Sequence, residues 1–477
     1  MHVAIIGGGP AGLSAGYALS QSGVPVTVLE QFPVVGGLAR TVEFEGHHFD
    51  IGPHRFFTKS VEVNKLWQTV LGSDLMAVER TTRILYRHRM FDYPLTALNT
   101  LRGLGPAHAA SMILSYATAR TQALLNPTTP ENFEEWVVQH FGRRLYSAFF
   151  KTYTEKVWGI PCTEIGADWA GQRIKGLTLL EAVKNALGLK GQGPRTLVDE
   201  FLYPRFGAGM LYERMARHIE ENGGRILCHQ KVTRVRCEGS RVVGVTAVDA
   251  NGRSTEIPCT HCLSSAPLSS LVKNLWPNAP DGVQSSAASL RYRNHLSVNL
   301  IVHGNPFPDQ WIYVHAREAR MARIANYRNF SPAMATDGDT TPITVEYFAF
   351  PYEDLWRQDD ADLIAMAAAE LNATGILTPD RVKSGFVIRS AQAYPVIEVA
   401  AQEQVRDIRE YLGQFSNLLQ IGRSGMFKYN NQDHAIMTGL LAARRVKGEP
   451  VDPWSVNIDA EYHEAGASNA VEIEAVA

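Results

Sequence analysis

The chain has 477 residues, and its 46 Lys and Arg residues nearly balance 48 Asp and Glu residues, so the formal net charge is -2. A chain of this length can bury a large core and divide into two or three domains. Without a basic surplus to neutralise phosphates, nucleic acid is excluded as the expected partner and a small molecule is favoured. Five cysteines, an odd number, do not make a disulfide framework and are typical of a reducing, cytoplasmic location.

Processing, metal and membrane signals are weak. The chain opens on an apolar strand with no charged or cleavable segment before it, so we expect no secretion. Cys259 and Cys262 have a metal-type spacing, but no second pair lies nearby to complete a tetrahedral site, so no metal is expected. The most apolar long segment, 107–125, is interrupted by Arg120 and polar residues. We expect a buried helix there rather than a transmembrane one, with weak membrane-surface contact as the open alternative.

The first predicted elements form a βαβ unit. Gly7, Gly9 and Gly12 follow an apolar strand and open a helix. Gly7 permits a tight turn, Gly9 lets the backbone approach a pyrophosphate, and Gly12 permits close packing of helix and strand. The helix N-terminus favours phosphate charge. The next strand ends at Glu30, where a carboxylate can accept hydrogen bonds from ribose hydroxyls, so the pattern predicts a dinucleotide site.

A second glycine pair refines this prediction. Gly36 and Gly37 follow Glu30 closely, and Arg40 comes three residues later. This arrangement resembles flavoproteins of the glutathione-reductase type, in which the glycine pair and the arginine lie against the FAD pyrophosphate. The resemblance implies noncovalently bound FAD, contacted by Gly37 and Arg40. A Rossmann unit for a nicotinamide cofactor is the alternative.

Later segments resemble further parts of that FAD site. Val232 lies on a predicted strand and corresponds to a position whose backbone meets the adenine. Near the C-terminus, Gly422 follows a strand and Asp433 opens a helix. In this superfamily the helix N-terminus approaches the flavin, where its dipole stabilises negative charge on the reduced ring. The resemblance therefore adds Val232, Gly422 and Asp433 to the cofactor site.

The expected fold is α/β: a glutathione-reductase-type FAD-binding Rossmann domain with an interleaved α+β substrate domain. The FAD domain is expected to comprise residues 1–78, 201–270 and 401–455, including an antiparallel meander from residue 225. Residues 79–200 are expected to be helical, and 271–400 to supply the substrate-domain sheet, with strands at 296–302 and 343–350 and an Ala-rich helix at 361–372. The tail, 456–477, is expected to be disordered.

Three motifs narrow the resemblance to one enzyme family. They are Tyr-Thr-Glu-Lys-Val-Trp-Gly at 153–159, Gly-Arg-Ser-Gly-Met-Phe-Lys-Tyr at 422–429, and the segment 50–58. All three resemble segments of UDP-galactopyranose mutases that lie beside the sugar nucleotide, hold its diphosphate and pass over the flavin ring. The resemblance implies a substrate site made of Tyr153, Lys156, Trp158, Arg423 and Tyr429. In the structural alternative, Tyr153 and Trp158 are core aromatics.

Three departures weaken the mutase hypothesis. Arg173 is followed by Leu177 where mutases carry a second Arg, unless Lys175 replaces it; Phe57 stands in place of a His, and Asn431 in place of an acid. Chain length and the helical insert resemble protoporphyrinogen oxidases and amine oxidases. We therefore favour an oxidoreductase in which flavin N5 accepts a hydride from a C–H bond of a small molecule, such as a nucleotide-linked or lipid-linked sugar. A mutase, in which reduced flavin attacks an anomeric carbon, remains the alternative, with a non-catalytic FAD scaffold third.

Four residues are candidates for the chemical step. His54 and Glu346 are candidates for acid–base catalysis, and Arg423 and Tyr429 for stabilising charge beside the flavin. His54 has a structural alternative, in which it fixes its loop through a backbone hydrogen bond. Glu346 has one too, an ion pair with Arg323 across the substrate sheet.

Overall fold

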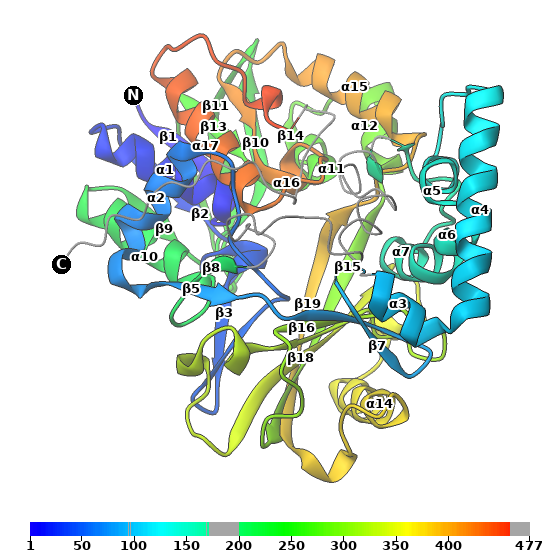
Figure 1. The fold of residues 1–477 in the computed structure, drawn as a ribbon. Coiled ribbons are helices and arrows are strands. Elements are labelled where there is room, and N and C mark those ends of the chain that lie inside the picture. Colours follow the sequence, from blue (N-terminus) through cyan, green and yellow to red (C-terminus); the bar gives the residue numbers. More distant parts are fainter. Residues whose placement is uncertain (94, 96, 168, 171–199, 458–477) are drawn as a thin grey trace.

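The computed structural model describes most of the chain. Residues 94, 96, 168, 171–199 and 458–477 are not described (Figure 1). The sequence departures around residues 173–177 and nearly all of the predicted tail therefore lie outside the described residues.

A five-stranded parallel sheet forms the nucleotide-binding part. Its order is β20-β13-β1-β2-β9, and all neighbouring strands are parallel. The strands are short and apolar, and come from distant parts of the chain: β1 (Val3–Ile6), β2 (Val26–Leu29), β9 (Arg225–Leu227), β13 (His261–Ser264) and β20 (Leu418–Gln420). The chain thus returns repeatedly to one sheet, which confirms the predicted Rossmann-type core.

Helices cover this sheet closely. They are α1 (Pro10–Gln21), α2 (Val61–Leu71), α10 (Gly209–Glu221) and α17 (Gln432–Val446). A Cβ on Gly12 would lie 2.0 Å from the Gly7 carbonyl oxygen, and one on Gly439 would lie 2.2 Å from the Ala11 oxygen. Because only glycine fits at these two positions, α1 can approach both the β1 turn and α17. This packing brings the two helix N-termini toward the same end of the sheet.

The predicted meander needs one correction. Residues 225–227 join the parallel sheet as β9 instead of the antiparallel one. The four-stranded sheet has the order β12-β11-β10-β14, and β11 is antiparallel to both of its neighbours, β10 and β12. They are β10 (Lys231–Glu238), β11 (Arg241–Val248), β12 (Ser254–Pro258) and β14 (Leu275–Trp276).

A seven-stranded sheet forms the second half of the molecule. Its order is β19-β15-β18-β17-β16-β6-β7. The strands are β6 (Thr82–Tyr86), β7 (Arg89–Asp92), β15 (Tyr292–His303), β16 (Trp311–Val314), β17 (Arg323–Asn326), β18 (Thr340–Ala349) and β19 (Val382–Pro395). The strands predicted at 296–302 and 343–350 are confirmed. The prediction that 79–200 is helical is wrong for 82–92, since its hairpin extends this sheet.

Smaller elements join the two halves. Two-stranded sheets pair β3 (Thr41–Phe44) with β4 (His47–Asp50), and β5 (Leu75–Glu79) with β8 (Glu200–Pro204). The short helices are α11 (Leu268–Lys273), α12 (Asp281–Ser289), α13 (Asp354–Arg357), α15 (Ala401–Leu412) and α16 (Gly422–Gly425). Helix α14 (Asp360–Ala373) confirms the predicted Ala-rich helix.

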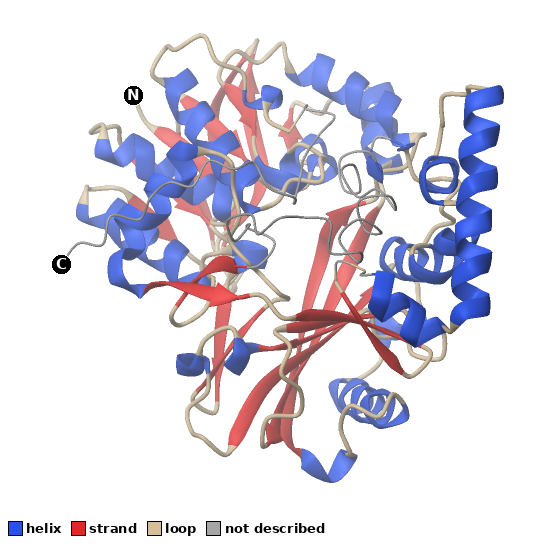
Figure 2. Ribbon diagram, viewed as in Figure 1, coloured by secondary structure: helices blue, strands red, loops and turns tan. Residues whose placement is uncertain are grey.

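Helices gather along one side of the large sheet (Figure 2). They are α3 (Ala97–Leu104), α4 (Pro106–Leu125), α5 (Phe133–Phe141), α6 (Arg143–Phe149) and α7 (Lys151–Trp158). The expectation of a buried helix at 107–125 is wrong: α4 lies at the edge of the molecule, and Ala119 is its one buried residue. Its outer face exposes Ile113, Leu114, Leu124 and Leu125. Across the described chain, no helix combines the length and apolar character needed to cross a membrane.

Candidate active site

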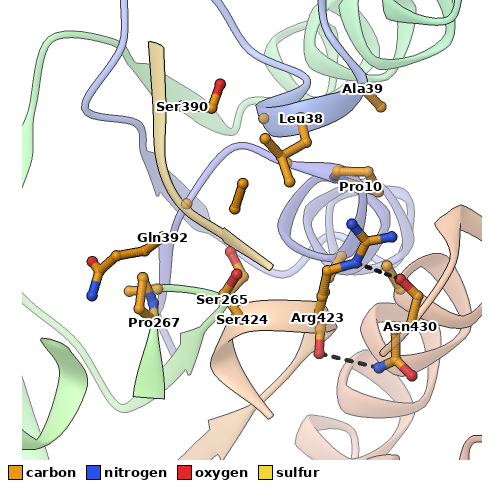
Figure 3. Close-up of a pocket in the computed structure, with 18 of the residues that line it drawn as sticks. Pro10, Leu38, Ala39, Ser265, Pro267, Ser390, Gln392, Arg423, Ser424 and Asn430 are labelled. Atoms are coloured by element: carbon orange, nitrogen blue, oxygen red, sulfur yellow. Dashed lines mark hydrogen bonds between the residues drawn. The ribbon is translucent and has the colours of Figure 1, made fainter. Parts of the chain in front are cut away.

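One cavity of about 700 Å³ collects residues from both halves of the molecule. Its lining includes every predicted cofactor residue except Gly12, which instead packs α1 against the β1 turn. These lining residues are Gly7, Gly9, Glu30, Gly37, Arg40, Val232, Gly422 and Asp433. Strands β16, β17 and β19 line the cavity with Trp311, Tyr313, Arg323, Ser390 and Tyr394. The nucleotide fingerprint and the large sheet therefore face a shared space (Figure 3).

The two glycine motifs pack against each other at this cavity. Gly36 donates a backbone hydrogen bond of 2.7 Å to the Gly8 oxygen. A Cβ on Gly37 would lie 3.1 Å from the Gly9 Cα, and Gly37 has a positive φ of 57°. Side chains at these positions would push the two loops apart and fill the space beside the N-terminus of α1. The cavity wall is therefore bare backbone where a pyrophosphate is expected, which fits FAD.

Glu30 and Arg40 are fixed by backbone groups. The two carboxylate oxygens of Glu30 accept hydrogen bonds from the Gly8 N–H (2.8 Å) and the Phe32 N–H (2.9 Å). Burial raises the pKa of Glu30, while these bonds and Arg40 oppose the shift. Arg40 donates to the Gly37 oxygen at 2.7 Å. Because each carboxylate oxygen can accept more than one hydrogen bond, Glu30 keeps capacity for ribose hydroxyls.

The C-terminal segment completes the cofactor side. Gly422 has a positive φ of 76°, and its N–H donates to the Thr438 hydroxyl of α17 at 2.9 Å. Helix α17 begins with a capping box between Asn431 and His434. Asp433 lies in its first turn and lines the cavity. The N-termini of α1 and α17 thus both reach the cavity, so the described residues fit a bound FAD from pyrophosphate to ring.

Arg423 lies beside two tyrosine rings, Tyr394 and Tyr429, which stack on each other with centroids 6.2 Å apart. Its guanidinium carbon lies 4.8 Å from the centroid of the Tyr394 ring and 5.1 Å from that of Tyr429. Its Nε donates to the Asn430 oxygen at 2.8 Å, a bond drawn in Figure 3. Within the described chain, its two Nη groups make neither an ion pair nor a hydrogen bond. The planar fork is therefore positioned, with donors left for an anionic ligand.

Glu346 is a buried ion-pair residue rather than a cavity-lining acid. One of its carboxylate oxygens accepts from Arg323 Nη2 at 2.6 Å and from His295 Nε2 at 2.9 Å. Although burial raises the pKa of Glu346, the positive charge of Arg323 and the His295 hydrogen bond lower it to about 2. A carboxylate with so low a pKa is a poor proton acceptor. The structure therefore contains the ion pair with Arg323 that the alternative predicts, and a catalytic role of Glu346 stays a prediction.

His54 lines the cavity as a neutral imidazole. Its Nε2 lies 2.8 Å from the Leu38 oxygen and 3.0 Å from the Ile51 oxygen. Both partners are acceptors, so Nε2 carries the proton and Nδ1 is left as an acceptor. Burial, followed by the charge of Arg423, lowers the pKa of His54 to about 4. His54 thus makes the backbone contacts of its structural alternative while remaining at the cavity.

The motif at 153–159 does not reach the cavity as expected. The Lys156 ammonium donates three hydrogen bonds of 2.9–3.0 Å, to the backbone oxygens of Val314, Ala316 and Met321. Trp158 is 2% exposed and packs against Trp169 and Tyr429. Tyr153 stacks on His315, with ring centroids 4.9 Å apart. None of the three lines the cavity. The structure thus gives Lys156 and Trp158 structural contacts away from the cavity lining, and their role in substrate binding stays a prediction, whereas Tyr429 and Arg423 do line the cavity.

Arg323, Tyr313 and Tyr394 are the cavity residues that the motifs did not identify. They belong to β17, β16 and β19, and Arg323 pairs across strands with Glu346. A signal existed for Arg323, because a lone arginine and a lone glutamate lie in two otherwise apolar strand segments. The five cysteines are free thiols, and no cluster of metal-ligating side chains occurs in the described parts of the chain.

Comparison with known proteins agrees with this geometry. The family of flavin-containing amine oxidoreductases matches residues 10–447. Among curated proteins, a probable UDP-galactopyranose mutase of Klebsiella pneumoniae is 25% identical over 177 residues, covering 35% of this chain and 43% of that protein. A 4,4'-diapophytoene desaturase of Methylomonas sp is 40% identical over 60 residues, covering 13% of this chain and 12% of the relative. The chain thus matches less than half the length of these relatives.

Solved structures share the fold over nearly the whole chain. The crystal structure of a reduced UDP-galactopyranose mutase has a TM-score of 0.80 at 20% identity and covers 94% of both chains. A putrescine oxidase variant has a TM-score of 0.61 at 16% identity, covering 94% of this chain and 98% of its own. With the fingerprint residues gathered at one cavity, the cofactor is FAD. The chain belongs to the family of flavin-containing amine oxidoreductases.

Proposed function

We propose that the protein is an FAD-dependent oxidoreductase that removes a hydride from a C–H bond of an anionic small molecule held by Arg423. One observation carries this proposal: the Arg423 guanidinium lies against the stacked rings of Tyr394 and Tyr429 at the FAD cavity, with terminal donors that no described residue uses. A carboxylate or phosphate oxygen accepting from such a fork makes short, charge-assisted hydrogen bonds. Anchoring of this kind positions a substrate for reaction.

The charges beside the Tyr394 and Tyr429 rings favour holding an anionic substrate over expelling a diphosphate from it. Arg323 also lines the cavity, but the fully buried carboxylate of Glu346 compensates its charge, with 2.6 Å between Arg323 Nη2 and the Glu346 oxygen. Arg423 has no such compensation among the described residues. Of these two arginines, Arg423 alone therefore offers an uncompensated charge, whereas a departing diphosphate carries about two negative charges and requires more.

The other residues around the cavity orient Arg423 and the substrate and exclude water. When bound, FAD supplies the acceptor for the hydride. The Tyr394 and Tyr429 rings restrict the orientation of Arg423 and provide apolar walls. His54, neutral with a free acceptor at Nδ1, is suited to accepting a hydrogen bond from a substrate N–H or O–H. Its low pKa makes His54 a weak base, so the reacting group of the substrate is expected to need no proton transfer to it.

A second candidate is the mutase-type isomerisation of a sugar nucleotide. The observation that favours it is Arg323, a second cation at the cavity in a chain whose motif lacks the second arginine. In this alternative, Arg423 and Arg323 together hold the diphosphate, and no net electrons leave the substrate. Similarity to UDP-galactopyranose mutases suggests UDP-galactopyranose as the first probe.

Anaerobic spectroscopy distinguishes the two candidates. The oxidised holoprotein is mixed with a panel of UDP-sugars that includes UDP-galactopyranose, and the visible absorption of the flavin is followed. We expect bleaching by an oxidisable member of the panel, with about one oxidised product per FAD as set by two-electron stoichiometry. Absence of bleaching, together with exchange between pyranose and furanose forms only after dithionite reduction, would establish the mutase instead. A panel that neither reduces the flavin nor isomerises would contradict both candidates for nucleotide-linked sugars.

A further inference from the structure

A second cavity, of about 360 Å³, lies apart from the FAD cavity and shares no lining residue with it. It is formed by α4, α6, the turn after β6 and the loop that follows β16. Its lining residues are Tyr86, Arg87, Leu104, His108, Ser111, Met112, Arg144, Ser147, Ala148, His315, Ala316, Arg317 and Glu318. None of them belongs to a motif identified in the sequence.

The charges around this cavity are unbalanced. Arg87, Arg144 and Arg317 line it, and within the described chain none of them forms an ion pair with a carboxylate. Glu318 is the one acid among these lining residues, and it lies 3.6 Å from the ring of His88 outside the lining. Three arginines gathered around one hollow repel one another unless an anion occupies it. The cavity is therefore electrostatically suited to a negatively charged group.

The floor of the cavity carries a buried polar side chain without a partner. His315 is 5% exposed, and its Nδ1 makes no hydrogen bond with any described residue. Burial, followed by the charge of Lys156, lowers the pKa of His315 to about 3, so the ring is neutral and has one N–H to donate. His315 is therefore a neutral polar group in the cavity lining whose hydrogen-bonding capacity the described protein does not fully use.

Local contacts fix the loop that carries these groups. Arg317 Nε donates to the Thr152 hydroxyl at 3.3 Å, and His315 stacks on Tyr153 with an interplanar angle of 8°. Tyr153 in turn meets Tyr313 edge-on, with ring centroids 5.4 Å apart, and Tyr313 lines the FAD cavity. The rings of His315, Tyr153 and Tyr313 thus form a chain of contacts from the second cavity to the FAD cavity.

We propose that this second cavity binds a phosphate group through Arg87, Arg144 and Arg317, with His315 on its floor. Phosphate matches the site because its several oxygens can accept from more than one arginine at once. The same group can come from a soluble phosphate ester or from the headgroup of an anionic lipid. The lipid source is relevant because α4, which lines the cavity with His108, Ser111 and Met112, exposes an apolar outer face. This site is independent of the reaction proposed for the FAD cavity.

Titration of the holoprotein with inorganic pyrophosphate tests the site. Arg144→Gln and Arg317→Gln each remove one cation, and we expect the dissociation constant to rise about tenfold or more for each, the scale of one charge-assisted contact. Arg143→Gln is the matched control. Arg143 is the neighbour of Arg144 in the chain, but its side chain is 65% exposed, pairs with Glu134 and does not line the cavity. The control should bind as the wild type does. Thermal unfolding of each variant verifies that these exposed substitutions leave the fold intact.

A further variant distinguishes pyrophosphate bound at the FAD cavity from pyrophosphate bound at the second cavity. Arg423→Gln weakens any pyrophosphate held beside the flavin, but should leave the component that depends on Arg144 and Arg317. The proposal is overturned if pyrophosphate does not bind, or binds Arg144→Gln and Arg317→Gln as tightly as it binds the wild type. Sedimentation with phosphatidylcholine vesicles, with and without phosphatidic acid, then identifies the source. Binding to phosphatidic acid vesicles that Arg144→Gln abolishes assigns the site to a lipid headgroup, and its absence assigns the site to a soluble phosphate.

Discussion

The two halves of the molecule obey different rules. Around the five-stranded parallel sheet, motif residues far apart in the chain meet at one cavity, from Gly7 and Gly37 to Gly422 and Asp433. Around the seven-stranded sheet, Lys156 and Trp158 of the motif at 153–159 and the acid–base candidate Glu346 are used for hydrogen bonding, packing and ion pairing. The residues that do reach the cavity from this sheet, such as Arg323, belong to no local motif.

The difference follows from what each half must do. A glycine in the cofactor half is required because a backbone atom lies where a Cβ would be, as at Gly12, where the Gly7 oxygen is 2.0 Å away. This requirement is local, and so it leaves a fixed spacing in the sequence. In the other half, a side chain faces the cavity because of strand register and pairing between distant strands. Its role is a property of the sheet, which no short segment encodes.

The largest effect should come from filling the glycine contact in the cofactor half. Gly12→Val places atoms inside the Gly7 carbonyl and separates α1 from β1, so we expect loss of FAD and of the folded N-terminal unit. Absorbance of the purified protein and thermal unfolding measure both. Gly282→Val is the matched control, because nothing lies within 4 Å of a Cβ at Gly282. Normal FAD content in Gly12→Val would contradict the close packing of α1.

The next effect tests the ion pair in the large sheet. Glu346→Gln leaves the charge of Arg323 buried without its partner, and we expect a loss of about 3 kcal/mol in the free energy of unfolding at neutral pH. The pKa of Glu346 in the folded state, about 2, lies below the ordinary value of 4.5 for a glutamate. Its stabilising effect is therefore complete above pH 4.5 and disappears as the pH falls toward 2. Denaturant unfolding across this range should show the two proteins converging in acid; a constant difference would exclude the ion pair as its cause.

The features that could be predicted from the sequence lie mainly in the cofactor half, and those that could not lie mainly in the half with the seven-stranded sheet. The parallel sheet, the glycine contacts and the position of Asp433 could be predicted, because apolar strands followed by glycines constrain the backbone directly. The hairpin β6–β7 was missed, since its partner β16 lies more than 200 residues later in the chain. Helix α4 was expected to be buried because its composition is apolar, but burial depends on what packs against a helix. The resemblance to mutases identified Arg423 and Tyr429 but misplaced Lys156, whose ammonium binds three backbone oxygens.

A smaller effect tests whether Arg423 is the anion-binding residue at the FAD cavity. Arg423→Ala removes a cavity arginine whose charge no described carboxylate compensates. We expect the dissociation constant for UDP, followed through the flavin spectrum, to rise by roughly tenfold. Arg406→Ala, on the exposed face of α15, removes the same charge from a side chain that is 69% exposed and should leave UDP binding unchanged. Equal binding by both variants would show that Arg423 has a structural role, like Lys156.

The smallest expected effects distinguish the roles of two neighbouring aromatic residues, Tyr429 and Trp158. Tyr429 lines the cavity, while Trp158 packs behind it with ring centroids 5.5 Å apart. Tyr429→Phe removes a hydroxyl, so we expect UDP affinity to fall by roughly two- to tenfold, the value of one neutral hydrogen bond. Trp158→Phe removes buried volume and should lower the unfolding temperature, but change UDP affinity by less than about twofold because no ligand contact is lost. A stronger loss of UDP affinity in Trp158→Phe than in Tyr429→Phe would show that Trp158 contacts the ligand. Trp158 would then not be a packing residue behind Tyr429.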